Sequence, residues 1–158
     1  MTPASMTELS PPRSEASALE HRFILTQVER FTLVLPAIWV AEIMRIDRSQ
    51  ILDLPFYDPL LVGIANYNGR ITPLIAASRL LEIAQLPLPE RLMVVRLNEG
   101  AEGLGNVGLI VDRAIGSSTR AELPHELFTS ERSEAMVMMR SSLVPADLWH
   151  PQYWSIDN

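Results

Sequence analysis

The sequence predicts a mainly β protein made of small barrels. Short runs of β-forming residues bounded by turn residues recur along the chain, whereas a single segment carries a convincing helical repeat. Strands that follow one another without alternating helices favour barrels over a parallel α/β sheet. The 158 residues are 47% hydrophobic and 20% charged, so the chain has enough apolar material for a buried core.

Two hairpins are expected in the first half of the chain. Asn68-Gly69 is the strongest hairpin signal, because both residues tolerate the positive φ angles of a type I′ turn. Pro36 suits the first position of a helix, so we expect one helical turn over 36–40 and, further on, a polar loop over 48–59. The strands expected here are 22–28, 31–36, 41–46, 60–67 and 70–75.

The second half is expected to begin with a short helix over 76–85, which ends before two prolines. Turns are expected over 98–105 and at Gly116-Ser117. The apolar face of the helix is formed by Ala76, Leu80, Ile83 and Ala84. The strands expected here are 92–97, 106–115, 119–124 and, less clearly patterned, 136–144.

The two ends differ in composition from the middle. Residues 1–20 are polar and rich in proline and serine, which predicts a disordered lead-in that is neither a signal peptide nor a membrane anchor. Residues 148–158 form an aromatic tail with Trp149, Tyr153 and Trp154. We expect this tail to dock on the protein's own barrel edge, with a hydrophobic contact for a partner as the alternative.

Composition excludes several classes of function. The net charge is −6, the pI is about 5.0 and the 13 cations are all arginine, which argues against a nucleic-acid partner and leaves no lysine for a Schiff base or a P-loop. Without cysteine there is no disulfide and no thiolate zinc site. The histidines at 21, 125 and 150 lack metal-site spacing, so no metal is expected.

No catalytic constellation stands out. The glycines at 103, 105 and 108 match a dinucleotide-binding fingerprint by letter, but the apolar segment after them predicts a strand rather than the required helix. We therefore interpret these glycines as part of a turn and expect no cofactor. No serine lies in a nucleophile elbow, and the paired carboxylates flank loops.

Three blocks of sequence occur in order along the chain. The first is RFILTQVERFTLVLPAIWVAEIMRI over 22–46, and the last is VGLIVD over 107–112. Between them, Gly63 to Pro73 is similar to the pattern Gly-x-x-Asn-x-Arg-Gly-x-x-x-Pro. Together the blocks, which cover about residues 22–123, resemble the chemotaxis coupling proteins of the CheW family. Asn68 stands where that family usually has Arg, and Ala76 where it usually has Asp.

The resemblance implies a fold and a function. The fold would be two small SH3-like β-barrels packed on a shared core, with short helices, over residues 21–147. The function would be that of a non-enzymatic adaptor that couples a methyl-accepting-type receptor, at its cytoplasmic tip, to the regulatory domain of a histidine kinase. A decoy that occupies the kinase without contacting a receptor is the alternative. We expect a cytoplasmic protein without membrane insertion, open to recruitment to membrane-bound receptor arrays.

The resemblance also implies contact residues. The positions of the family pattern place kinase contacts at Glu42, Ile43 and Arg45, and receptor contacts at Asn66, Asn68, Gly69 and Arg70. Two structural alternatives stay open. Alternation with Ala41 favours a core position for Ile43, and Asn66 suits a residue that bonds its own turn.

Overall fold

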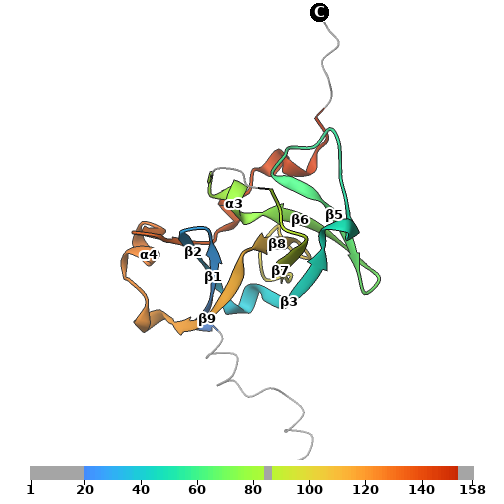
Figure 1. Ribbon diagram of the computed structural model, residues 1–158. Helices are drawn as coiled ribbons and strands as arrows, with labels where there is room; N and C mark the ends of the chain where they lie inside the picture. The colour runs from blue at the N-terminus through green and yellow to red at the C-terminus, as the bar shows by residue number, and fades with distance from the viewer. Residues whose placement is uncertain (1–19, 84–86, 153–158) are drawn as a thin grey trace, which may run out of the picture.

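Two β-sheets share one hydrophobic core in the computed structural model, which describes residues 20–83 and 87–152 (Figure 1). Sheet A contains, in spatial order, β10 (Arg132–Ser133), β11 (Met136–Met138), β2 (Phe31–Pro36), β1 (Arg22–Val28) and β9 (Arg113–Thr119). Sheet B contains β3 (Val40–Asp47), β7 (Arg91–Leu97), β8 (Gly108–Val111), β6 (Arg70–Ala76), β5 (Leu61–Tyr67) and β4 (Ile51–Leu52).

Short helices connect the strands. The α-helical turns are α3 (Ala77–Leu80) and α4 (Glu126–Thr129). The 3-10 turns are η1 (Ala37–Trp39), η2 (Arg48–Gln50), η3 (Arg120–Glu122), η4 (Ser141–Leu143) and η5 (Ala146–Trp149). Neighbouring strands run antiparallel except β11 beside β2 and β6 beside β8, which are parallel. None of the described helices is long and apolar enough to cross a membrane.

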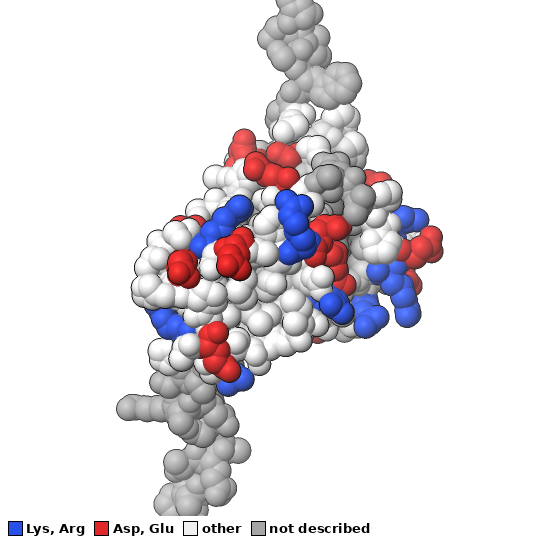
Figure 2. Space-filling view, turned by 60° about the vertical axis from the view of Figure 1, so that its left-hand side comes forward, with Lys and Arg blue, Asp and Glu red and all other residues white. Residues whose placement is uncertain are grey.

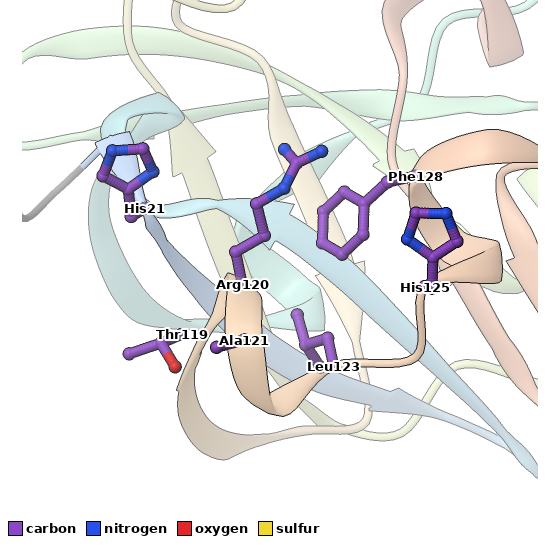
Figure 3. A pocket seen from close by; sticks show the side chains of 7 residues that line it. All are labelled: His21, Thr119, Arg120, Ala121, Leu123, His125 and Phe128. Atoms are coloured by element: carbon purple, nitrogen blue, oxygen red, sulfur yellow. The ribbon is translucent and has the colours of Figure 1, made fainter.

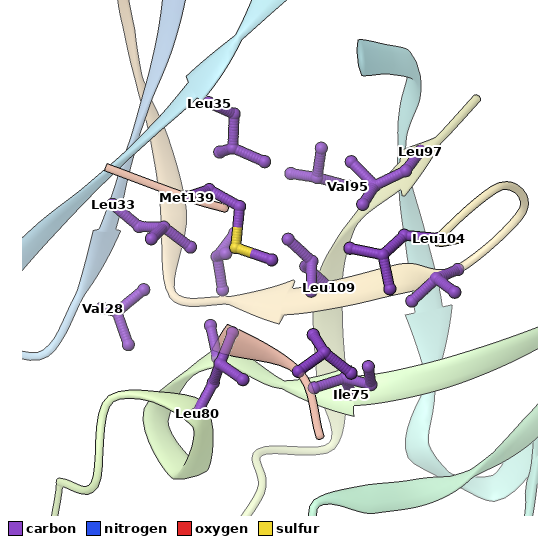
Figure 4. Packing of buried hydrophobic residues seen from close by; sticks show 14 of the residues in the cluster. Val28, Leu33, Leu35, Ile75, Leu80, Val95, Leu97, Leu104, Leu109 and Met139 are labelled. Atoms are coloured by element: carbon purple, nitrogen blue, oxygen red, sulfur yellow. The ribbon is translucent and has the colours of Figure 1, made fainter. Parts of the chain in front are cut away.

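Strand alternation distributes the buried side chains among three hydrophobic clusters. In β2, Leu33 and Leu35 enter the core shared by the two sheets, whereas Val34 enters a smaller cluster of sheet A. In β8, Leu109 enters the shared core and Ile110 a smaller cluster of sheet B. Successive side chains point to opposite faces of a strand, so central strands buried on both faces read as continuous apolar runs. Figure 4 shows the shared core between the two sheets.

The two predicted hairpins of the first half are confirmed. β1 pairs with β2, and β5 pairs with β6. Asn68 has φ 52° and Gly69 has φ 78°, the left-handed pair that a two-residue type I′ turn needs. The helical turn expected after Pro36 is η1. The loop expected over 48–59 also contains η2 and the two-residue strand β4. Neither element was predicted, because the segment is polar and contains proline.

The helix predicted over 76–85 is shorter than expected. Of the described residues in this range only α3 is helical, and Glu82, with φ 58°, takes the left-handed conformation that ends it. Leu80 is buried and Ile83 packs against the shared core, so the apolar side chains meet the core as predicted without a continuing helix. Ala84 lies outside the described residues.

The single strand predicted over 106–115 is two strands in different sheets. The chain leaves sheet B after β8 and enters sheet A as β9, and the division falls at Asp112. The Asp112 carboxylate accepts a hydrogen bond from the Glu29 backbone N–H at 2.6 Å, which ties this crossover to the β1–β2 turn. Gly116-Ser117, predicted as a turn, lies within β9, and the irregularity there is a register shift against β1 between Leu25 and Thr26.

The strand predicted over 119–124 is also wrong. Its centre is the 3-10 turn η3, because the Glu122 carboxylate accepts hydrogen bonds from both the backbone N–H and the hydroxyl of Thr119 and so closes the segment locally. The strand predicted over 136–144 is confirmed only for β11, after which the chain turns into η4.

The described part of the tail packs on the protein itself. Leu148 in η5 is fully buried in the shared core, and Trp149 packs against that core. The Gln152 backbone N–H donates to the carbonyl of Phe56, which joins the end of the described chain to the β4–β5 loop. Tyr153 and Trp154 lie outside the described residues.

Candidate interaction surfaces

The β3 strand presents the three residues expected to contact a kinase. It is the outermost strand of sheet B, and within the described chain it pairs only with β7. Met44 and Ile46 are buried, so the alternation turns Ile43 and Arg45 outward. Ile43 is 42% exposed, which makes the core position favoured by alternation wrong. The expected phase placed Ile43 with Ala41 correctly, but both residues face away from the core.

Glu42 and Arg45 differ in what they already bind. The Glu42 carboxylate pairs with Arg96 of β7, with Nε and Oε1 2.9 Å apart. Arg45 is exposed, and its side chain has no hydrogen bond or ion pair to another described residue. Its guanidinium is therefore available to a partner, whereas the Glu42 carboxylate is shared with the sheet.

The β5–β6 hairpin presents the residues expected to contact a receptor. Asn66, Asn68, Gly69 and Arg70 are all exposed. The Arg70 side chain makes no hydrogen bond or ion pair within the described chain. The neighbouring Ile71 is 55% exposed, and its carbonyl accepts a hydrogen bond from the Asn106 side chain, which fixes the base of the hairpin to the β7–β8 loop. The hairpin projects from the side of the molecule opposite α4 (Figure 1).

A groove that the sequence did not predict lies on the sheet A side. Two adjoining hollows of about 520 Å³ and 400 Å³ share Arg120 and Phe128, and we call them together the A-side groove. The first is lined by those two residues with His21, Thr119, Ala121, Leu123 and His125 (Figure 3). The second is lined by them with Phe23, Pro36, Trp39, Met138, Met139, Arg140, Ser141 and Ser142.

The A-side groove combines apolar and cationic groups. Within 20–83 and 87–152, no aspartate or glutamate lines either hollow, although the chain as a whole carries a net charge of −6. The Arg120 guanidinium carbon lies 4.1 Å from the centre of the Phe128 ring. On the side of the molecule that carries β1, β9 and α4, acidic and basic side chains are otherwise interspersed over a largely uncharged surface (Figure 2). The described lining of the groove, which contains arginine and no acidic residue, therefore differs in charge from the net negative protein.

No local pattern in the sequence predicts this groove. Its aromatic residues are Phe23, Trp39 and Phe128, which are brought together by the packing of β1, η1 and α4. The one available signal was Trp39, a large aromatic residue in the segment predicted to form a single helical turn. Arg120 was placed in a strand by the sequence, and its position beside Phe128 depends on the turn η3.

The titratable groups give no sign of a catalytic or metal centre. Across 20–83 and 87–152, no three His, Asp or Glu side chains are grouped so that they could hold a metal ion. The one resolved change is at Glu122, whose pKa is lowered from its ordinary value of 4.5 by the hydrogen bond from the Thr119 backbone and, next, by that from the Thr119 hydroxyl. Glu122 is exposed and acts as a cap of η3.

The family can now be assigned. A model of the CheW-like domain matches residues 22–127, which is most of the described chain. The chain belongs to the CheW-like domain family. Domains of this family are non-enzymatic scaffolding modules of chemotaxis signalling, so the expectation that the chain is not an enzyme is confirmed by its family.

Solved structures agree on the fold of this CheW-like chain. It is similar to the crystal structure of the scaffolding protein TtCheW from Thermoanaerobacter tengcongensis, with a TM-score of 0.52 and 20% identity. The match covers 63% of this chain and 65% of that one, so somewhat less than two thirds of the TtCheW chain is spanned. The predicted fold of paired SH3-like barrels is confirmed. No curated protein matches the chain.

Proposed function

We propose that this CheW-like chain is a cytoplasmic adaptor that couples a methyl-accepting-type receptor to the regulatory domain of a histidine kinase. The observation that carries the proposal is the separation of its exposed surfaces. β3 lies on sheet B, the A-side groove lies beside α4, and the β5–β6 hairpin projects from the opposite side (Figure 1). Two partners that bind separate surfaces of one domain are held at high effective concentration, so the state of one biases the other.

The β3 surface is the proposed kinase contact. Ile43 supplies an exposed apolar side chain, and Arg45 supplies a guanidinium with no partner of its own. Glu42 precedes Ile43 in β3 and is half-buried against Arg96, so we assign it two roles, pairing with β7 and contacting the kinase. An apolar centre with a charged rim is typical of a protein interface of moderate affinity.

Two separate receptor contacts are proposed, one at the β5–β6 hairpin and one in the A-side groove on the other side of the molecule, each for a different segment of the receptor. The hairpin offers Asn66, Asn68 and Gly69 and the unpaired Arg70. The A-side groove offers the apolar surface that a receptor helix needs, with Phe23, Trp39 and Met138 among its lining. Asn68 stands where the family usually has Arg, and the two-residue turn keeps Arg70 close to that position.

Calorimetry with purified partners tests the proposal. The kinase regulatory domain and the receptor's helical cytoplasmic tip from the same cell would be titrated separately and then together. We expect micromolar binding of each, with Ile43→Asp weakening only the kinase and Trp39→Ala only the receptor. Glu102→Ala is the control, because Glu102 is exposed and is not among the residues assigned to any of the three surfaces.

The decoy alternative gives a different result. A decoy binds the kinase domain with the same Ile43 dependence but shows no heat with any receptor tip, and adding the receptor leaves kinase binding unchanged. Absence of binding to every regulatory domain encoded near the gene contradicts both readings.

A further inference from the structure

We propose that Arg120, held against the Phe128 ring, is a recognition site for a carboxylate of the receptor segment that enters the A-side groove. This inference rests on the proposed function and deepens it, because it names the chemistry of the segment that binds. The ligand is an Asp or Glu side chain that lies next to an apolar residue in the same segment.

The first observation is the position of the guanidinium. Its carbon lies 4.1 Å from the Phe128 ring centre, within the range of a cation–π contact. In Figure 3 the Arg120 side chain reaches over the hollow toward that ring. The ring contact occupies one face of the planar guanidinium, whereas hydrogen bonds to a carboxylate form in the plane, at its edge. Both contacts are therefore compatible.

The second observation is that the guanidinium lacks an acceptor. The Arg120 side chain makes no hydrogen bond or ion pair with any described residue, although the side chains of Arg48, Arg91, Arg96 and Arg140 all pair with carboxylates. The polar residues around Arg120 in this hollow are two histidines and a threonine, and no acidic residue of the described part of the chain lines it. A cation with five donors in an acid-free hollow favours an anionic ligand over a neutral one.

The third observation is that hydrogen bonds fix the backbone from which the Arg120 side chain extends. Arg120 is the first residue of η3, and the preceding Thr119 is bonded to Glu122 through its N–H at 2.8 Å and its hydroxyl at 2.9 Å. The Arg120 backbone N–H donates to the carbonyl of His21 at 3.0 Å, which joins η3 to the start of β1. A side chain that is positioned before binding loses less conformational freedom when it binds.

The arrangement of the two hollows selects the kind of ligand. Arg120 and Phe128 line both, so a carboxylate at Arg120 lies beside the apolar hollow of Phe23, Trp39 and Met138. A segment with an acidic residue next to an apolar one satisfies both parts at once. A free carboxylate or phosphate satisfies only the charged part and gains nothing from the apolar one.

The test compares Arg120→Gln, Arg132→Gln and Trp39→Ala, with the receptor's helical tip as the probe. Arg120→Gln keeps the length of the side chain and removes its charge, so we expect about tenfold weaker binding. Arg132→Gln makes the same charge change at an exposed side chain that lies outside the groove and has no hydrogen bond or ion pair with a described residue, so it should leave affinity within twofold. The loss in Arg120→Gln should shrink as salt is raised from 50 to 300 mM, because an exposed charge contact is screened.

The outcomes separate this inference from the function on which it rests. If Trp39→Ala abolishes binding while Arg120→Gln binds as the wild type does, the adaptor function stands and the carboxylate site is overturned. If the unmodified protein binds no receptor tip, the proposed function fails first. Titration with sodium acetate and with phosphate, followed by the NMR signal of the Arg120 side chain, should show only millimolar binding. Micromolar binding of either ion alone overturns a partner carboxylate as the ligand.

Discussion

The Glu42 carboxylate and the Arg96 guanidinium lie 2.9 Å apart and join β3 to β7 at the surface proposed for the kinase. The Arg96 side chain is only 14% exposed, whereas that of Glu42 is 39% exposed. Removal of the carboxylate therefore leaves a mostly buried cation without its partner, which is more costly than loss of an exposed pair. Glu42 consequently has a structural role beside any role in binding.

We predict that Glu42→Ala lowers the free energy of unfolding by about 1–2 kcal/mol. The measurement is urea unfolding, and the matched control is Ile43→Ala, an exposed side chain of the same strand that should change stability by less than about 0.5 kcal/mol. In a double-mutant cycle, Arg96→Ala should be less harmful when Glu42 is already absent. Strictly additive losses would show that the two side chains do not interact.

The turn at Asn68-Gly69 gives a second prediction. Gly69 has φ 78°, and a Cβ added there meets no atom within 4 Å, so a substitution is strained by its backbone alone. Gly69→Val should therefore destabilise the protein by roughly 1 kcal/mol or more relative to Arg70→Ala, which truncates an exposed side chain. Thermal unfolding measures the difference. Equal melting temperatures for the two variants would contradict a left-handed turn.

A third prediction concerns Gly108, the first residue of β8. A Cβ there would lie 2.6 Å from Cγ1 of Val94 and 2.8 Å from Cδ2 of Leu74, because β8 is pressed between β7 and β6. Gly108→Ala should cost about 1–3 kcal/mol through overpacking. The cost should fall in the double variant Gly108→Ala/Val94→Ala, where the clashing methyl group is gone. A double variant no better than the sum of its parts would contradict this packing.

A fourth prediction follows the lowered pKa of Glu122. The hydrogen bonds from Thr119 favour the charged carboxylate, so the folded pKa lies below 4.5. Stability from this cap is present above the unfolded pKa and is lost as the pH falls through the folded pKa. In NMR titrations, Thr119→Val should move the pKa of Glu122 up toward 4.5, because it removes the hydroxyl donor. An unmoved Glu122 would mean that the hydroxyl contributes nothing.

Local chemistry explains which parts of the fold were predictable from the sequence. The Asn68-Gly69 turn and the strands around it depend on residues within a few positions, and both were predicted correctly. The crossover at Asp112 depends on a hydrogen bond to Glu29, 83 positions away, so no local pattern showed that β8 and β9 belong to different sheets. β10 and β11 were obscure for the same reason, since β11 is ordered by parallel pairing with β2.

The candidate contact residues also divide into those that the sequence located and those that it missed. The resemblance placed Ile43 and Arg45 on β3 and Arg70 at a hairpin, and the structure shows all three exposed, while their roles stay predictions. The A-side groove was missed because Phe23, Trp39 and Phe128 come from separate parts of the chain. Alternation alone also misjudged Ile43, because it gives the phase of a strand but not which phase faces the core.

The tail gives the last prediction. Leu148 is fully buried in the shared core with Trp149 packed beside it, so we expect this end of the chain to stabilise the fold. Deletion of residues 148–158 should lower the melting temperature by several degrees, and Leu148→Ala alone should cost about 2–4 kcal/mol, as for a leucine removed from a packed core. Deletion of 153–158 is the control, because it keeps Leu148, Trp149 and the Gln152 contact to Phe56.

Calorimetry with the kinase and receptor fragments would be run on both truncations. Loss of stability in the longer deletion with binding retained in the shorter one identifies a structural anchor. Full stability in the longer deletion together with lost binding would instead make the tail a contact for a partner, and no change in either property would mean that the aromatic residues do neither.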